Sequence, residues 1–294
     1  PAAPDTVTAK TITLSGTVSV TGGARFTAQA GRHINVNGAL TTTNGQIILE
    51  ADSPTATTGA ADRIGQLTIS APVSSNNGAI TLIAGGNAGT NNSITGPDGN
   101  VNNVADNSGF RPIAIVDAGA GGINLALSRS TDELGIGVTG TITQILGNGV
   151  TTPGYGSISN LRTTGPMVIG RATTAGTDGL GTGAQTLTVN RISNTYNNSY
   201  IALTPIVAGS FELVAGGGGI LLDQPLTSFQ PTTITTTGTL TLSDPINTSG
   251  FSLTLPANVT ITGNGSINTG GGSCSGAACP VTDIFWDGGG GADK

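Results

Sequence analysis

Charge is scarce in this 294-residue sequence. Charged residues make up 9% of the chain, against about 25% in a typical soluble domain. Lysine occurs only at Lys10 and Lys294 and the arginines are scattered, so the chain has no basic run that would attract nucleic acid. It also lacks an apolar stretch long enough to cross a bilayer as a helix. The sequence therefore argues against nucleic acid as a partner and against a transmembrane segment.

Residues that carry chemistry are also rare. His33 is the only histidine, and we interpret it as a surface residue because no Ser or Cys partner stands at a recognisable spacing. The acidic residues are dispersed along the chain. Asp132 and Glu133 are neighbours, and we expect them in a solvated turn. The sequence does not predict the converging carboxylates that acid–base catalysis needs, so we expect no enzyme activity and no cofactor.

Glycine and a repeated apolar pattern dominate instead. The chain has 48 glycines, and an apolar-x-apolar group recurs, followed by a Gly or Pro and then by another apolar residue. A second apolar pair stands about thirteen residues after the first, and repeats of this size are typical of stacked arrays. The clearest copies are Ile12, Leu14 and Val18 with Phe26 and Ala28; Ile34, Val36 and Leu40 with Ile47 and Leu49; Leu67, Ile69 and Val73 with Ile80 and Leu82; Ile220, Leu222 and Leu226 with Ile234; and Leu240, Leu242 and Ile246 with Leu253 and Leu255.

Within each copy the apolar residues alternate with Thr, Asn or Ser, which is the period-two pattern of a strand with one buried face. Pairs such as Asn44-Gly45 and Asp244-Pro245 lie between the strands and favour turns. Short strands cornered in this way predict an all-β fold, a β-solenoid with coils of about twenty residues. We expect a rod over residues 1–268 with loop insertions near 51–64 and 85–109, irregular corners within 117–215, and a Gly-rich C-terminal segment over 269–294.

Two stretches carry a resemblance to a known family: Asn44-Gly45-Gln46-Ile47-Ile48-Leu49-Glu50-Ala51 and Asn77-Gly78-Ala79-Ile80-Thr81-Leu82-Ile83-Ala84. Their Gly-x-Ile-x-Leu cores resemble the degenerate repeats of filamentous-haemagglutinin-like exoproteins of bacterial two-partner secretion. The resemblance covers residues 10–84 and 216–268 well and the middle loosely. It implies a right-handed parallel β-helix, exported through an outer-membrane secretion partner and acting in adhesion outside the cell. The family's Asn-Pro-Asn-Leu and Asn-Pro-Asn-Gly-Ile secretion motifs do not occur, so we expect a passenger segment or a different secreted solenoid.

One group of residues offers oxygen ligands for calcium. Asp98, Asn100, Asn102 and Asp106 supply carboxylate and amide oxygens at close spacing, which suits that ion. The bidentate Glu that closes an EF-hand loop does not follow them. We therefore favour a polar loop over a calcium site and predict no metal centre.

The C-terminal region holds the only cysteines, Cys274 and Cys279, five positions apart. A pair this close could form a small disulfide loop in an oxidising compartment. Two free thiols or half of a metal site are the alternatives, although no His or further Cys lies nearby to complete such a site. Phe285 and Trp286 follow, and we interpret them either as a contact point for a partner or as packing over the end of the rod. Further upstream, the Thr-rich stretch 232–241 is expected to form a hydrogen-bonded ladder on the surface.

Three functions are compatible with this architecture. The first is a non-enzymatic, secreted or cell-surface shaft in bacterial adhesion, whose loops, especially 85–109, meet a host or a neighbouring cell. The second is a self-assembling subunit of an extracellular filament, because unprotected strand edges recruit further strands. The third and least supported is a polysaccharide-active β-helix enzyme, because the acidic and basic residues do not converge.

Overall fold

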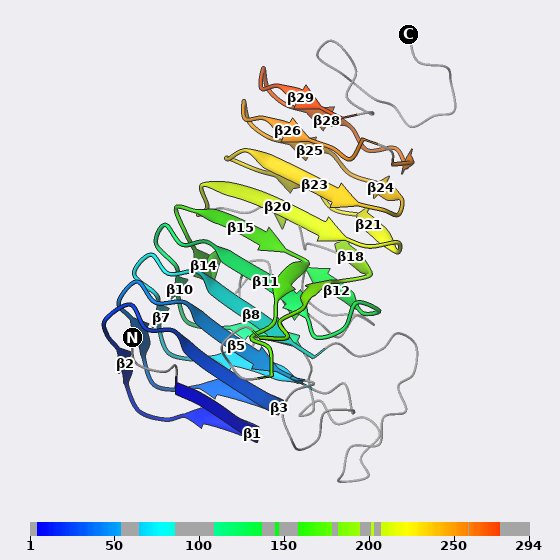
Figure 1. Cartoon of the computed structure of the whole chain (residues 1–294). Helices are drawn as coiled ribbons and strands as arrows, with labels where there is room; N and C mark the ends of the chain where they lie inside the picture. The colour runs from blue at the N-terminus through cyan, green and yellow to red at the C-terminus, as the bar shows by residue number, and fades with distance from the viewer. Residues whose placement is uncertain are drawn as a thin grey trace.

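A computed structural model describes residues 5–53, 65–85, 109–136, 145–146, 158–177, 182–194, 201–202, 207–257 and 259–276. Within these ranges the regular structure consists of β-strands and one short 3-10 helix, η2 (Ile158–Asn160). The strands wind around a common axis, and the chain climbs from its first coil at one end to β29 (Cys274–Ser275) at the other (Figure 1). The protein is therefore an all-β rod, as the repeated pattern predicts.

The coils have three faces, and the first face is one continuous parallel stack. β1 (Asp5–Leu14) and β3 (Phe26–Val36) are long strands that begin on this face and continue onto the second face. The beginning of β3 pairs with β5, whereas its end pairs with β6 (Gln66–Ile69). The first face contains β1, β3, β5 (Ile47–Ala51), β8 (Ile80–Ala84), β11 (Ile123–Leu127), β15 (Pro166–Ile169), β20 (Ser210–Ala215), β23 (Thr232–Thr236), β26 (Leu253–Thr254) and β29, in that order.

The second and third faces are stacks of shorter strands. The second contains the ends of β1 and β3, then β6, β9 (Gly109–Pro112), β13 (Ile145–Leu146), β12 (Glu133–Ile136), β18 (Arg191–Asn194), β21 (Gly219–Leu222), β24 (Leu240–Leu242) and β27 (Ile261–Thr262). The third contains β2 (Val18–Val20), β4 (Leu40–Thr42), β7 (Val73–Ser74), β10 (Val116–Asp117) and β14 (Leu161–Arg162), and then β19 (Ile201–Ala202), β22 (Leu226–Thr227), β25 (Ile246–Asn247) and β28 (Ile267–Asn268). An isolated parallel bridge from Arg162 to Val207 carries the third face past β14.

The stack keeps one register along the rod, with a coil of 21 residues where the chain is uninterrupted. Residues that face each other on successive coils of the first face are 21 positions apart at Asp5↔Phe26, Phe26↔Ile47, Phe211↔Thr232, Thr232↔Leu253 and Leu253↔Cys274. The stack therefore continues past residue 268, where the sequence suggested that the rod ends. The right-handed winding remains an expectation of the family resemblance.

In the middle of the chain the register holds while the intervening chain grows longer. Stacked partners are separated by 33 to 44 positions at Ile47↔Ile80, Ile80↔Ile123, Ile123↔Met167 and Met167↔Phe211. The extra residues therefore leave the coil and return to the same place in it. The insertions expected near 51–64 and 85–109 fall at two of these positions, between β5 and β6 and between β8 and β9, and most of their residues lie outside the described ranges.

The core is a set of apolar columns that run along the axis. Alternate residues of each strand point inward, and they are almost fully buried from Ile34 and Leu49 near one end to Leu242 and Leu253 near the other. In-register stacking of β-branched and leucine side chains removes them from water over the whole length of the rod. Two threonines of β23, Thr232 and Thr236, also point inward and are buried.

Hydroxyl groups line one corner of the core, after the strands of the third face. The side chain of Thr42 donates to the carbonyl of Gly45 at 2.5 Å, and that of Thr248 donates to the carbonyl of Phe251 at 2.6 Å. Ser228 donates in the same way to the carbonyl of Gln230 at 2.9 Å. These bonds satisfy buried hydroxyls within the turn next to them, so the polar corner has little cost.

Glycine is required where the same corners of neighbouring coils touch. A Cβ atom on Gly45 would overlap the carbonyl oxygen of Ala24, and a Cβ atom on Gly78 would overlap the carbonyl oxygen of Gly45. The Asn-Gly pairs that the sequence marks as turns thus have two roles. Asn44 and Asn77 adopt positive φ angles of 60° and 90°, and the following glycine lets the backbones approach.

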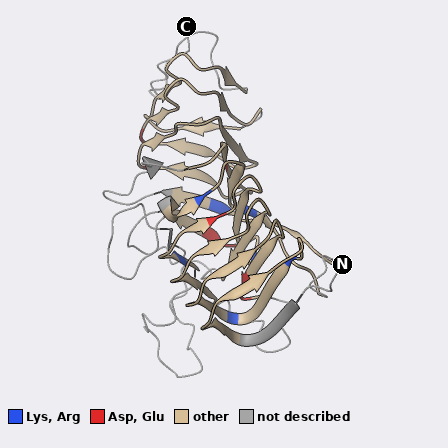
Figure 2. Cartoon of the chain, turned by 90° about the vertical axis from the view of Figure 1, so that its left-hand side faces the viewer, with Lys and Arg blue, Asp and Glu red and all other residues tan. Residues whose placement is uncertain are grey.

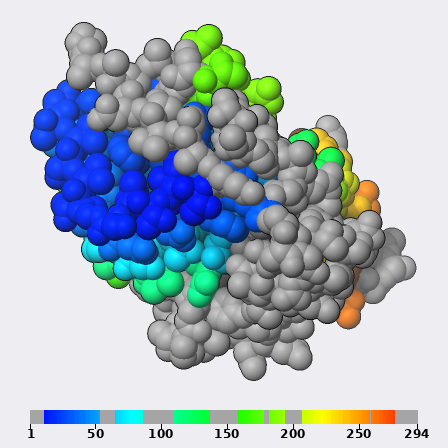
Figure 3. Space-filling model, turned by 90° about the horizontal axis from the view of Figure 1, so that it is seen from below, coloured from blue at the N-terminus to red at the C-terminus, as the bar shows by residue number. Residues whose placement is uncertain are grey.

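The outer surface carries few charges. Among the described residues, Figure 2 shows acidic and basic residues as isolated segments of a ribbon that is mostly of other residue types. Beyond Arg191 the described chain contains only Glu212, Asp223 and Asp244 as charged residues. At the two ends, β1 pairs only with β3 and β29 pairs only with β26 among the described strands. Figure 3 looks onto the first coil and shows its residues on the surface of that end.

Candidate functional site

A buried carboxylate lies on the outer side of the first face. Glu50 belongs to β5 and points away from the core column, yet its side chain is fully buried. Its carboxylate accepts three hydrogen bonds. Ser53 Oγ donates to Oε1 at 3.0 Å, and Gln29 Nε2 and the backbone N–H of Ala175 donate to Oε2 at 3.2 and 3.3 Å. Groups that are 125 positions apart in the sequence thus meet at one carboxyl group.

A β-hairpin brings Ala175 to this place. After β15 the chain leaves the coil and forms β16 (Arg171–Thr173) and β17 (Thr186–Thr188), which pair with each other in antiparallel fashion. β16 also pairs antiparallel with β11 and contacts β8. In Figure 1 the green trace that follows β15 descends across these strands toward the N-terminal coils. The carbonyl of Gly176 accepts a hydrogen bond from Gln29 Nε2 at 3.0 Å, which anchors the hairpin to β3.

A second polar group occupies the corner beside Glu50. Asp52 has a φ of 55° and is buried. Its Oδ2 accepts a hydrogen bond from Ser128 Oγ at 2.6 Å and lies 3.8 Å from Arg129 Nε. Because Ser128 and Arg129 follow β11 and Asp52 follows β5, these contacts tie together coils that are two steps apart along the rod.

Asp132 lies in the same region, and the prediction of a solvated turn is wrong for it, since its side chain is only 1% exposed. Asn190 lies where the chain returns from the hairpin. Its backbone N–H donates a hydrogen bond to the carbonyl of Asp132 at 2.9 Å. Glu133 remains partly exposed and pairs with Arg191 at 3.7 Å. His33 is half-buried rather than a surface residue, and its Nδ1 accepts a hydrogen bond from the backbone N–H of Gln66 at 3.1 Å.

Burial controls the protonation of Glu50. Desolvation raises the pKa of the Glu50 carboxyl, and the hydrogen bonds from Ala175, Ser53 and Gln29 oppose this rise only in part. A substrate in solution has no access to a fully buried carboxyl group. The arrangement therefore places a proton-binding group at the contact between the hairpin and β5.

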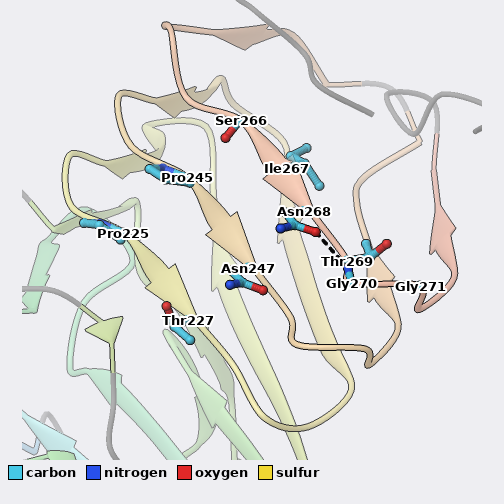
Figure 4. Close-up of a pocket in the computed structure, with 10 residues that line it drawn as sticks. All are labelled: Pro225, Thr227, Pro245, Asn247, Ser266, Ile267, Asn268, Thr269, Gly270 and Gly271. Atoms are coloured by element: carbon cyan, nitrogen blue, oxygen red, sulfur yellow. Dashed lines mark hydrogen bonds between the residues drawn. The ribbon is translucent and has the colours of Figure 1, made fainter. Parts of the chain in front are cut away.

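A groove on the third face is the other candidate site. It has a volume of about 600 Å³ and runs across β22, β25 and β28 near the C-terminal end of the described stack (Figure 4). Asn247 and Asn268 lie on neighbouring strands, and each Oδ1 accepts a backbone N–H two residues later, from Ser249 and Gly270, at 2.9 Å. None of the residues that line the groove has an ionisable side chain. They are Pro225, Thr227, Pro245, Asn247, Ser266, Ile267, Asn268, Thr269, Gly270 and Gly271. The groove can offer hydrogen bonds to a neutral polar partner.

Most of the site residues proposed from the sequence lie outside the described ranges. These are the calcium candidates Asp98, Asn100, Asn102 and Asp106, together with Cys279, Phe285 and Trp286. Cys274 lies in β29, stacked on Leu253, and its thiol is not free. Its pairing with Cys279 remains a prediction. Within the described ranges, no group of three or more His, Cys, Asp or Glu side chains is placed to hold a metal ion.

Sequence reasoning missed Glu50 and Gln29 as partners of a distant hairpin. One signal was present, because Glu50 is a charged residue inside the apolar run Ile47-Ile48-Leu49-Glu50-Ala51. A charge in such a run is expected to be paired when it is buried. The partner could not be found from spacing, since the hairpin lies in the part of the chain with the weakest repeat.

Comparison with known proteins adds no identity: no protein-family model, no curated protein and no solved structure matches the chain. In the part of the chain that the structure describes, no helix has the length and apolar character needed to cross a membrane.

Proposed function

We propose that this chain is a non-enzymatic structural shaft in bacterial adhesion, secreted or held at the cell surface. The observation that supports this proposal best is the unbroken register of the first face, from β1 to β29. Each coil buries its apolar residues against the next, so the coils form one continuous column rather than separate domains. A body of this kind holds a binding element at a fixed distance from its point of attachment.

The dimensions and the surface suit such a role. Ten strands stack on the first face, and a rise of about 4.8 Å per coil gives a described stack roughly 40 Å long. The outer residues are largely Thr, Ser, Asn and Gly, and charges are few. A neutral surface has little long-range attraction for other macromolecules. Contacts with a host or a neighbouring cell would then depend on particular loops or grooves.

The resemblance to filamentous-haemagglutinin-like exoproteins supports the extracellular location in this proposal. It rests on the Gly-x-Ile-x-Leu cores at Gly45 and Gly78. The resemblance also implies that the chain is a passenger segment and that an outer-membrane secretion partner exports it. The uncharged groove over β25 and β28 would be one place where such a shaft contacts a neutral polar surface.

A filament subunit is the alternative, and the ends of the described stack favour it. The outer edges of β1 and β29 have no partner strand among the described residues. Open edges of parallel strands can accept a further copy, and head-to-tail stacking with a constant rotation produces fibres.

Negative-stain electron microscopy and sedimentation of the purified full chain separate the two proposals. The shaft predicts single rods whose sedimentation does not change with protein concentration. Long fibres of uniform width would reject the shaft in favour of the filament.

Beads coated with the chain then test adhesion. A variant that lacks residues 26–46, one complete coil in register that contributes no residue to the groove, serves as a matched control. The shaft proposal predicts that beads with the intact and the shortened chain adhere equally to cells. It fails if neither preparation adheres above uncoated beads.

A further inference from the structure

The hairpin β16–β17 covers a part of the rod that would otherwise be an exposed sheet surface. Ile48 and Ile83 point outward from β5 and β8, as does Ala126 from β11, because their neighbours on each strand point into the core. All three are nevertheless buried, at 2%, 0% and 0% exposure. Farther along the same face, Thr233 and Thr235 of β23 occupy outward positions and remain partly exposed. The outward Val168 of β15 and Val214 of β20 are buried as well, so the covered surface ends before β23.

The hairpin departs from the stack at a glycine. Gly170 has a φ of 98°, and a Cβ atom there would overlap the carbonyl oxygen of Val214 on the next coil. From this point the hairpin runs back over earlier coils and meets β5 and β3 through hydrogen bonds from Ala175 to Glu50 and from Gln29 to Gly176. Its own pairing is short and includes a bond from Thr174 N to Gln185 O at 2.9 Å. Its attachment to β5 therefore depends on the state of the Glu50 carboxyl.

We propose that the hairpin β16–β17 is a proton-dependent clasp, which holds the outer face of β5 and β8 most firmly when Glu50 is protonated and opens more readily when Glu50 is ionised. Burial of a carboxylate away from solvent costs free energy that a neutral carboxyl group avoids. Opening the clasp returns the group to water, where ionisation has no such cost. Raising the pH therefore shifts the equilibrium toward the open state.

The direction of the effect follows from proton linkage. Burial raises the pKa of Glu50 in the closed state, whereas in the open state the carboxyl regains its ordinary value. The closed state consequently binds more protons between these two values, and closure weakens as pH rises through that window. The weakening reaches a plateau above the pKa of the closed state. One titrating group can change the opening constant by at most about tenfold per pH unit.

Other charged groups belong to the elements packed around Glu50. They are Arg32 and the titratable His33 on β3, Asp52 after β5, Arg129 and Asp132 after β11, and Arg171 on β16. Asp52 is bonded to Ser128 and lies near Arg129, and Arg171 pairs with Glu212 at 3.1 Å. None of these charges is a cause of the raised pKa of Glu50, which comes from burial. Variants at Asp52 and Asp132 can therefore separate their titration from that of Glu50.

Hydrogen exchange of the full chain, followed by mass spectrometry on peptides from residues 171–188, tests the clasp. Exchange is measured between pH 4.5 and 8 and corrected for the intrinsic dependence of amide exchange on pH. In the wild-type chain, protection of this segment is expected to fall as pH rises through the window and then to level off. In Glu50→Gln, which keeps the shape of the side chain without its charge, protection is expected to be independent of pH and higher than in the wild type at pH 7.5.

Three controls define the outcome. Glu133→Gln changes a partly exposed carboxylate paired with Arg191 and is expected to leave the pH dependence intact. Asp52→Asn and Asp132→Asn are expected to retain it as well. Peptides from β23 report whether each variant keeps the fold. The proposal is overturned if protection of 171–188 in the wild type does not change with pH, or if the change persists in Glu50→Gln.

A second measurement does not depend on the Glu50 variant folding. An infrared titration of the wild-type chain is expected to show a protonated carboxyl band that persists above the ordinary Asp and Glu range and disappears in step with the loss of protection. Disappearance of all carboxyl bands within the ordinary range would reject the clasp.

Discussion

Replacing Gly78 by alanine tests the close stacking of the coils. Gly78 is the glycine of the Asn-Gly turn before β8, and a Cβ atom at this position would overlap backbone atoms of Gly45 and Gln46 on the coil beneath. Its φ is not positive, so alanine suffers no conformational strain there. The perturbation is therefore the separation of two coils at one corner. Backbone atoms cannot rotate away as a flexible side chain can.

The expected magnitude follows from two opposing effects. Inserting a methyl group into a packed interior costs about 1–3 kcal/mol, while replacing glycine stabilises by about 0.4–1 kcal/mol through the unfolded chain. The two ranges combine to a net loss of about 0–2.6 kcal/mol in the free energy of unfolding, with a midpoint of about 1.3 kcal/mol. Gly217→Ala is the matched control, because a Cβ atom there has no atom within 4 Å. That variant is expected to be more stable than the wild type by about 0.4–1 kcal/mol.

Urea denaturation followed by far-ultraviolet circular dichroism measures both variants. Since a stacked array can unfold in more than one step, hydrogen exchange of β5 and β8 should accompany it and show the loss next to the substituted corner. Equal shifts of the denaturation midpoint in Gly78→Ala and Gly217→Ala would refute the reasoning, because the corners would then not be in contact.

Three further predictions follow from the core, the buried carboxyl group and the coil length. Leu49 is 0% exposed, and Leu49→Ala is expected to lower the free energy of unfolding by about 2–5 kcal/mol. Ile115 is 38% exposed, and Ile115→Ala should change the free energy of unfolding by less than about 0.5 kcal/mol. Similar urea midpoints for the two variants would contradict the assigned core. Because burial raises the pKa of Glu50, the stability of the wild-type chain relative to Glu50→Gln should be greatest in acid and decline as pH rises through that raised pKa. Urea denaturation of both chains from pH 4.5 to 8 measures the difference in their free energies of unfolding. A difference that does not change with pH would contradict the raised pKa of Glu50. Deleting residues 232–252 places Leu253 opposite Phe211, in the position that Thr232 occupies in the wild type. The shortened chain should therefore fold, with a circular-dichroism strand signal per residue equal to that of the wild type. A deletion of residues 232–241, which does not remove a whole coil, should not fold.

The inward columns could be predicted from the sequence because their cause is local. Alternation of apolar and polar residues assigns Ile34, Val36, Ile47 and Leu49 to one side of their strands, and all four are buried. The spacing of the copies in the chain gives a coil of about twenty residues, and the stack has 21. These features depend only on strand geometry and on the removal of apolar side chains from water.

The outer layer could not be predicted, because it depends on contacts between distant parts of the chain. The charge of Glu50 inside an apolar run indicates a buried partner, but nothing in that stretch indicates that the partner is a hairpin from residues 171–188. Likewise, nothing around Asp132 in the sequence indicates that the backbone N–H of Asn190 bonds to its carbonyl.

Thr232 and Thr236 are a different case. The sequence suggested a ladder of threonines on the surface over residues 232–241, but these two point into the core, where Thr232 bonds to Gln230 and Thr236 to Gly216. Thr241 does form the expected surface contact, with its hydroxyl 3.1 Å from that of Thr262. A residue that is both polar and β-branched fits either side of a strand, so alternation alone cannot assign it.

If the chain is a continuous rod built from 21-residue coils, each added coil must lengthen it in solution without widening it. Three additional copies of residues 232–252 are inserted after residue 252, so that every copy enters in register. Small-angle X-ray scattering of the purified chains then compares their longest dimension and their cross-section. The longest dimension of the extended chain is expected to be greater by about 14 Å, with an unchanged cross-section, because each coil adds about 4.8 Å along the axis. A wider cross-section at constant length, or the scattering of an expanded chain, would contradict a continuous rod.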